Sequence, residues 1–250
     1  MQRGDLSLLG GRPSTGKTTA ALQIVNQAII SGVGTMLFSL ETPAKTLLRR
    51  LACMSMSIDY QKWRSGALGA TEQEDLFQET ERLRTDRHLR INERALATVP
   101  SIHADLRRTK GEQEIGLVVI DYLQLMHSAG KHQNRVSEVS EISRDLKLAA
   151  VEFQLPFLVL SQLNRTPETE NRAPQLSDLR ESGSLEQDAD LVIFLWCPKS
   201  EMVDDYHATA TEMIVAKQRN GPIGAFDTLF VKRLARLEEA AAESPAFVGR

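Results

Sequence analysis

A glycine-rich loop near the start of the chain constrains the fold more than any other feature of the sequence. Residues Gly11–Thr18 read Gly-Arg-Pro-Ser-Thr-Gly-Lys-Thr and fit the pattern G-x-x-x-x-G-K-S/T at every position. The apolar strand candidate Leu6–Leu9 precedes this loop, and the helix candidate Lys17–Ile30 follows it. In such a context the glycines let successive backbone N–H groups face phosphate oxygens beside a positive helix end. The segment therefore predicts a site for a nucleoside triphosphate.

The polar side chains of this loop have separate expected roles. Lys17 is expected to reach the β- and γ-phosphates of the nucleotide, and the hydroxyl of Thr18 is expected to ligate Mg²⁺. A nucleoside triphosphate and Mg²⁺ are therefore the ligands that the loop predicts, and the family resemblance described below implies that the nucleotide is ATP. The residues expected to hold the nucleotide are Gly11, Arg12, Pro13, Ser14, Thr15, Gly16, Lys17, Thr18 and Thr19.

Short apolar runs alternate with segments of helical periodicity along the rest of the chain. The further strand candidates are Thr35–Leu40, Leu117–Asp121, Phe157–Gln162, Leu191–Trp196 and Glu212–Lys217. The further helix candidates are Pro43–Ser57, Glu72–Arg84, Pro100–Lys110 and Arg135–Phe153. This alternation predicts an α/β fold, with a mostly parallel twisted sheet and helices on both faces. We expect one domain over residues 1–236 and a flexible tail over residues 237–250.

Polar residues stand at the carboxyl ends of several predicted strands. Ligands of such sheets bind at these ends. Asp121 ends an apolar run and is predicted to be the second protein group at the Mg²⁺ ion. Glu41 follows another apolar run, and it either activates water or favours the dipole of the next helix. Gln162 either senses the γ-phosphate or caps its strand. Spacing alone leaves both pairs of alternatives open.

Composition excludes several classes of protein. The 30 Lys and Arg against 33 Asp and Glu give a net charge of −3, which does not favour DNA binding, because such affinity comes mainly from basic side chains. No apolar stretch approaches the about 18 residues of a membrane span, and the N-terminus has no apolar signal region. Cys53 and Cys197 lie far apart without metal-ligand spacing. A cytoplasmic protein without a membrane partner is expected.

Further segments of the chain match motifs of one known family. They are Gly11–Thr19, Phe38–Glu41, Ile120–Met126, Glu141–Arg144, Leu160–Arg165, Ser177–Ser184, Glu186–Asp190 and Lys217–Pro222. They follow the family's order, and from Gly4 to about Phe230 the chain resembles the C-terminal motor domain of DnaB-family replicative helicases. The resemblance implies a RecA-like P-loop ATPase that forms a homo-hexamer around single-stranded DNA. It further implies 5′→3′ translocation and unwinding of duplex DNA.

The resemblance also implies residue roles that spacing could not decide. Glu41 resembles the family's catalytic glutamate, and Gln162 resembles its γ-phosphate sensor. Lys217 and Arg219 resemble the pair that reaches the ATP of the neighbouring subunit. Such an arginine finger places positive charge where it develops on the transferring phosphoryl group.

Another implied role concerns DNA. The segment Asp178–Ser184 resembles the family's loop that faces single-stranded DNA in the central channel of the ring. Arg180, Glu181 and Gly183 are the positions implied to meet the phosphate backbone, partly through main-chain N–H groups. A few such groups per subunit, repeated around a ring, would bind DNA without sequence preference. A slightly acidic chain is compatible with this arrangement.

The chain also departs from the family pattern. Family members carry an N-terminal helical domain and a linker helix, whereas Met1 here stands a few residues before the first strand candidate. Primase binding and loader binding are therefore in doubt. One alternative function is a regulatory ATPase, similar to the KaiC-like relatives, that lacks a DNA-facing loop. Another is a helicase-associated module that does not unwind DNA by itself.

Overall fold

A single large sheet organises the molecule. The computed structural model describes residues 1–93, 97–110, 113–128, 130, 132–179, 183–198 and 208–240. The sheet has the spatial order β3 (Leu89–Glu93), β2 (Thr35–Ser39), β4 (Leu117–Asp121), β5 (Phe157–Gln162), β1 (Leu6–Gly11), β6 (Leu191–Trp196), β7 (Thr209–Gln218), β8 (Gly224–Val231) and β9 (Arg236–Glu239). Neighbouring strands from β3 to β6 are parallel, and those from β6 to β9 are antiparallel.

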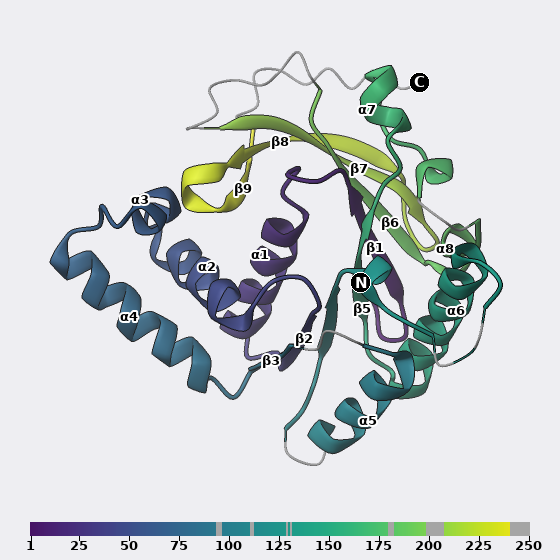
Figure 1. Ribbon diagram of the computed structural model, residues 1–250, viewed down its shortest axis with the longest axis horizontal. Helices are drawn as coiled ribbons and strands as arrows, with labels where there is room; N and C mark the ends of the chain where they lie inside the picture. The colour runs from purple at the N-terminus through teal and green to yellow at the C-terminus, as the bar shows by residue number, and fades with distance from the viewer. Residues whose placement is uncertain are drawn as a thin grey trace.

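Helices cover both faces of the parallel part of the sheet (Figure 1). One face carries α1 (Lys17–Ile30), α2 (Ala44–Met56), α3 (Tyr60–Ser65) and α4 (Ala70–Thr85). The other face carries α5 (Val99–Lys110), α6 (Arg135–Phe153) and α8 (Gly183–Asp188). The short helix α7 (Thr166–Glu170) lies beyond the end of β5. The predicted α/β architecture with helices on both faces is confirmed.

Alternation along the strands divides the core between these two layers. Leu8 packs with the α5 and α6 side, whereas Leu9 packs with the α1 and α2 side. Val118 and Val119 are divided in the same way, and both are fully buried. Since each fully buried aliphatic side chain contributes about 1.5–3 kcal/mol, the central strands hold the two layers together. Their continuous apolar runs follow from burial on both faces.

The sequence predicted the long elements better than the short ones. Helices α1 and α6 have the predicted bounds, and the strand candidates all occur as strands. The strands β3, β8 and β9 and the helices α3, α7 and α8 were not predicted. The edge strand β3 is polar in part and only its first residue is buried, which hides the apolar signal of a strand. The missed helices are too short for a periodic pattern to emerge.

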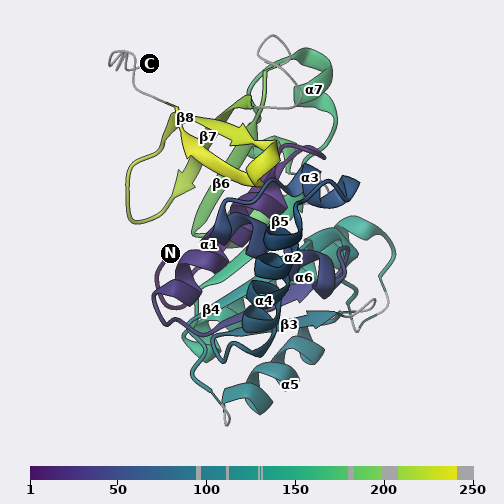
Figure 2. The same cartoon turned by 90° about the vertical axis from the view of Figure 1, so that its left-hand side faces the viewer.

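The antiparallel extension of the sheet bends over α1 (Figure 2). Strand β9 at its end begins at Arg236, and Leu237 is buried against the core around α1. The backbone of Leu237 exchanges hydrogen bonds with the Gln23 side chain, each 2.9 Å long. Residues 237–239 therefore belong to the sheet and not to the predicted tail, whose residues 241–250 lie outside the described part.

Among the described residues, no helix is both long enough and apolar enough to span a membrane.

Candidate nucleotide site

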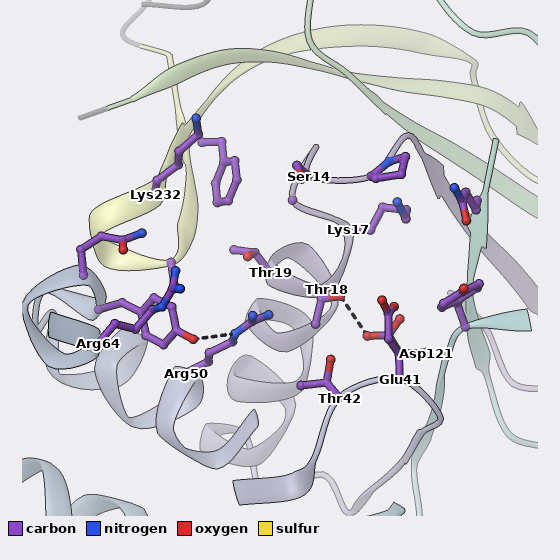
Figure 3. A pocket seen from close by; sticks show the side chains of 18 residues that line it. Ser14, Lys17, Thr18, Thr19, Glu41, Thr42, Arg50, Arg64, Asp121 and Lys232 are labelled. Carbon is purple, nitrogen blue, oxygen red and sulfur yellow. Dashed lines mark hydrogen bonds between the residues drawn. The ribbon is translucent and has the colours of Figure 1, made fainter. Parts of the chain in front are cut away.

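The predicted residues lie together where the parallel strands end, along the side of the sheet formed by the carboxyl ends of these strands. Gly11 is the register partner of Gln162, and Ser39 is the register partner of Asp121. The Leu40 N–H donates to the Asp121 carbonyl at 2.8 Å, which places Glu41 beside the end of β4. We call this side of the sheet the nucleotide edge. Its residues surround a cavity of about 500 Å³, shown in Figure 3.

The glycine-rich loop forms one wall of this cavity. Gly16 has a φ of +94°, a left-handed conformation that suits glycine, and it directly precedes α1. A Cβ on Gly11 would lie 2.6 Å from the Thr15 hydroxyl oxygen and 3.1 Å from the Leu195 carbonyl oxygen. The loop members that line the cavity are Pro13, Ser14, Gly16, Lys17, Thr18 and Thr19. Gly16 is therefore required for its backbone conformation, and Gly11 is required because a Cβ has no room there.

Not every expected loop residue faces the cavity. Gly11 and Thr15 do not line the cavity. The Thr15 hydroxyl stabilises the turn by donating to the Arg12 carbonyl at 2.8 Å. The Arg12 side chain turns away and forms an ion pair with Glu168 of α7 at 2.8 Å. The predicted contact of Arg12 with the nucleotide would therefore be made by its backbone and not by its side chain.

Lys17 has its ammonium group inside the loop. Its Nζ donates to the carbonyl oxygens of Gly11 and Arg12, each at 2.8 Å. Burial lowers the pKa of Lys17 from 10.5 to about 8, although the nearby carboxylates of Asp121 and Glu41 act in the opposite direction. These carbonyl contacts hold the cation in reach of the α1 N-terminus, where anions bind favourably.

Thr18 and Asp121 come together as the predicted metal pair. The Thr18 hydroxyl donates to the Asp121 carboxylate at 2.9 Å. Burial raises the pKa of Asp121, and the negative charge of Glu41 adds to this effect, whereas the bond from Thr18 opposes it. A hydroxyl and a carboxylate beside a phosphate cradle fit Mg²⁺, which binds through one or two carboxylates together with substrate phosphates. A cation there would relieve the repulsion between Asp121 and Glu41.

A glutamine that the sequence analysis did not assign orients Gln162. The Gln124 side-chain oxygen accepts from the Gln162 N–H at 3.1 Å, and its amide nitrogen donates to the Ser161 hydroxyl at 3.0 Å. Gln124 lies in the 3₁₀ turn Leu123–Leu125 directly after β4. Gln162 itself lines the cavity. The position of Gln124 shortly after Asp121 was the signal that the sequence offered for its role. That role could not be predicted, because it depends on the pairing of β4 with β5.

Several further cavity residues were also missed by sequence analysis. Arg50 extends from α2 toward Thr18, and its Nε donates to the Tyr60 hydroxyl at 3.2 Å (Figure 3). Lys232 and Arg64 lie at the end of the cavity opposite Asp121 (Figure 3). The other wall residues that sequence analysis did not assign are Thr42, Tyr60, Gln61, Tyr122, Phe230 and Ala235. They come from distant parts of the chain, so only the folded structure reveals them.

Lys217 and Arg219 lie on the opposite side of the sheet, where the parallel strands begin. Because β7 runs antiparallel to β6, Gln218 pairs with Leu191 at the start of β6. The Lys217 ammonium donates to the Glu186 carbonyl at 2.5 Å, and Arg219 donates to the Gln187 carbonyl at 2.9 Å. Burial and the charge of Arg219 lower the pKa of Lys217. We call this side, made by Lys217, Arg219 and the carbonyl end of α8, the finger edge.

The predicted DNA-facing residues are described only in part. Gly183 is the first residue of α8, and a Cβ placed on it would meet no other described atom within 4 Å. Arg180 and Glu181 lie outside the described residues. The described chain before them reaches Leu179, whose backbone forms an antiparallel bridge with Leu163 directly after β5.

The sheet order, the glycine-rich loop and the cavity at the carboxyl ends of the strands define a RecA-like P-loop nucleotide-binding domain. Comparison with known families identifies it further. The chain belongs to the DnaB-like helicase C terminal domain family, whose model matches residues 1–239. This result confirms the family resemblance inferred from the motifs.

Individual relatives agree with this assignment. The chain is 41% identical over 234 residues to the "Replicative DNA helicase DnaB" of Geobacillus stearothermophilus, covering 92% of the chain and 51% of that relative. It is 42% identical over 240 residues to the "Replicative DNA helicase DnaC" of Bacillus subtilis, with coverages of 92% and 51%. The chain thus spans about half the length of the curated relatives it matches.

Solved structures show the same architecture. The chain matches the solved structure of an ATPase domain with a TM-score of 0.87 and 33% identity, covering 96% of this chain and 86% of that one. It matches "The Structure Of A DnaB-Like Replicative Helicase And Its Interactions With Primase" with the same TM-score and identity, covering 96% and 58%.

Proposed function

We propose that this chain is the ATP-hydrolysing motor of a replicative-type DNA helicase that works as a homo-hexameric ring. The observation that carries the proposal is the separation of Lys217 and Arg219 from the cradle of their own chain. They lie at the start of β6, whereas the glycine-rich loop follows the end of β1, and these two strands run parallel. A strand of this length spans about 17–20 Å. This distance from the chain's own cradle supports a role of the pair at the ATP of another copy of the chain.

The nucleotide edge supports ATP hydrolysis with Mg²⁺. Lys17 would exchange its carbonyl partners for phosphate oxygens, and the N–H groups at the start of α1 would hold the same oxygens. An Mg²⁺ ion held by Thr18 and Asp121 would supply positive charge against the charge that develops on the phosphates. Glu41 lines the same cavity and would orient and deprotonate the attacking water.

Two side chains would connect this chemistry to the rest of the ring. Gln162 lines the cavity at the end of β5 and would sense the γ-phosphate through its amide. Arg219 of one subunit would stabilise the charge of the transferring phosphoryl group in the next, with Lys217 beside it. Such a finger contributes about 10³–10⁵ in rate. Hydrolysis would then depend on contact between neighbouring subunits.

The DNA partner would be a single strand in the channel of the ring. Arg180, Glu181 and Gly183 are proposed to meet its phosphate backbone, and the motor would move 5′→3′ and unwind duplex DNA ahead of it. The relatives named as replicative DNA helicases support a role of this chain in unwinding DNA. We place the activity in the cytoplasm, where a buried free thiol such as Cys53 stays reduced.

The test combines turnover with assembly. ATPase rates are measured with and without single-stranded oligonucleotide, and sedimentation is measured with and without Mg²⁺ and ATP. We expect DNA to stimulate the rate and ATP to favour hexamers. A chain that stays monomeric, and whose ATPase rate ignores DNA, would contradict the proposal and favour a regulatory switch.

A further inference from the structure

The outward-facing side chain of the glycine-rich loop makes a connection that nucleotide binding does not explain. The Arg12 Nε donates to the Glu168 carboxylate at 2.8 Å, and Nη1 donates to the Leu163 carbonyl at 3.1 Å. The Arg12 side chain is 19% exposed. Glu168 belongs to α7, 156 positions further along the chain. One side chain thus joins the phosphate cradle to the segment that follows β5.

That segment is a closed unit, and it leads to the predicted DNA-facing residues. Its two ends meet where Leu163 bridges Leu179 and the Asn164 N–H donates to the Asp178 carbonyl at 3.0 Å. Arg172 holds the buried Asp178 carboxylate with two bonds of 2.7 and 3.0 Å. A displacement at Leu163 or α7 is therefore passed on to Leu179, directly before Arg180.

The cradle side of the connection changes when a triphosphate binds. Lys17 donates to the Arg12 carbonyl in this arrangement of the loop. A phosphate that attracts the Lys17 ammonium removes this bond, so the Arg12 carbonyl loses one of its donors. We propose that Arg12 and Glu168 form a positioning bridge that couples the filling of the phosphate cradle to the placement of the DNA-facing segment. This inference rests on the proposed function, since it concerns the communication between ATP and DNA.

Geometry distinguishes this pair from an ordinary surface ion pair. The Arg12 side chain also donates to a main-chain carbonyl and is only 19% exposed, whereas that of Glu168 is 51% exposed. The route also differs from the one through Gln162. Gln162 lies on β5, whereas the bridge bypasses that side chain and joins the loop after β1 to α7.

The test compares two carboxylates of the same short helix. Glu168→Gln removes the partner of Arg12 and keeps the size of the side chain. Glu170→Gln is the matched control, because Glu170 is similarly exposed and pairs with Arg172, whose two bonds to Asp178 this change leaves in place. For each protein, the ATPase rate is measured over a series of oligonucleotide concentrations. Binding of a non-hydrolysable ATP analogue is measured with and without oligonucleotide.

We expect Glu168→Gln to keep the ATPase rate without DNA and to lose about fivefold in the stimulation by DNA. The factor by which DNA tightens analogue binding should also fall, and the factor by which the analogue tightens DNA binding should fall equally, since coupling between two bound ligands is reciprocal. Glu170→Gln should behave as the unaltered chain. Equal stimulation in Glu168→Gln and the unaltered chain would overturn the bridge, and so would an equal loss in both variants.

A second variant protects the test against a folding defect. Arg12→Lys keeps the positive charge, but its single ammonium cannot reproduce the planar fork that serves both Glu168 and Leu163. The double variant with Glu168→Gln should lose no more coupling than either single variant, because both remove one connection. Additive losses would contradict the proposal. If the unaltered chain itself ignored DNA, the proposed function would fail, which is a different result from loss of coupling in the variants alone.

Discussion

The two functional edges of the sheet differ in how completely one chain builds them. At the nucleotide edge, Lys17, Thr18 and Asp121 are already arranged around one cavity by contacts within the chain. At the finger edge, Lys217 and Arg219 are bonded to the carbonyl end of α8, and the glycine-rich loop of the same chain lies at the other end of the strands. Under the proposed function, the nucleotide edge needs only its ligand, whereas the finger edge needs a neighbouring subunit.

Substitutions at the two edges are expected to have different consequences. A defect at the nucleotide edge removes the function of the subunit that carries it. In the proposed ring, a defect at the finger edge removes the function of the next subunit, because the finger serves another copy. Mixed assemblies can therefore distinguish the two edges, whereas assays on a single variant cannot.

The largest effect is expected from Lys17→Ala. This change removes the cation of the phosphate cradle, and ATP turnover should fall by at least about 10³-fold. Steady-state ATPase with single-stranded DNA present is the measurement. Lys62→Ala is the control, because Lys62 is exposed on α3 and lies outside the cavity. An unchanged kcat in Lys17→Ala would remove the basis for the nucleotide edge.

The next effect is expected from Arg219→Ala. This variant should bind the ATP analogue normally and hydrolyse ATP about 10³-fold more slowly, because only the transition state needs the finger. Arg107→Ala is the control, since Arg107 is a surface residue paired with Glu152.

Mixing the two variant proteins distinguishes the two edges directly. Rings that contain both Lys17→Ala and Arg219→Ala have some interfaces with an intact cradle and an intact finger. Such mixtures should recover part of the activity. If mixing restores nothing, Arg219 does not act on a neighbouring subunit.

A smaller effect concerns pH at the nucleotide edge. Burial lowers the pKa of Lys17 to about 8, so the ammonium that binds phosphate is lost above that pH. Analogue affinity should fall by up to about tenfold per pH unit between about pH 8 and 10. Titration calorimetry at several pH values measures this, with Lys17→Met as the control. A pH-independent affinity over this range would contradict the assigned role of the ammonium.

The same pKa has a consequence for stability with a defined sign. The unfolded chain keeps Lys17 protonated up to its ordinary pKa of 10.5, whereas the folded chain releases the proton near pH 8. The unfolded state therefore binds more protons between these values. In the ligand-free chain, the free energy of unfolding should rise with pH in this window relative to Lys17→Met, as measured by denaturant unfolding.

The smallest effect is expected from Gln124→Ala. The variant loses the bonds that orient Gln162 and Ser161, which should lower the free energy of unfolding by about 1–2 kcal/mol. The ATPase rate should fall a few-fold, because the cradle itself is untouched. Denaturant unfolding and ATPase measure the two effects. Gln78→Ala is the control, since its amide lies on the exposed face of α4. A variant that is as stable and as active as the control would show that Gln124 does not position Gln162.

Particular residues show how far sequence analysis reached. The loop Gly11–Thr19 was found at once, because the phosphate chemistry of a strand–loop–helix unit is local in sequence. Asp121 was found from the apolar strand before it. Glu41 and Gln162 were located but left with two interpretations each, and the family resemblance was needed to choose. The residues Arg50, Gln124 and Lys232 were missed, because their proximity to the site depends on how distant elements pack.

Apolar periodicity and short motifs are properties of neighbouring residues, so the α/β layering, the glycine-rich loop and the family could be predicted from the chain alone. The edge of the sheet that each residue occupies depends instead on the tertiary structure. Lys217 lies far from the cradle because β7 runs antiparallel to β6, and no local pattern encodes the direction of a strand. The structure also decided that Arg12 faces Glu168 and not the cavity. Such contacts join residues that are distant along the chain, and folding alone brings them together.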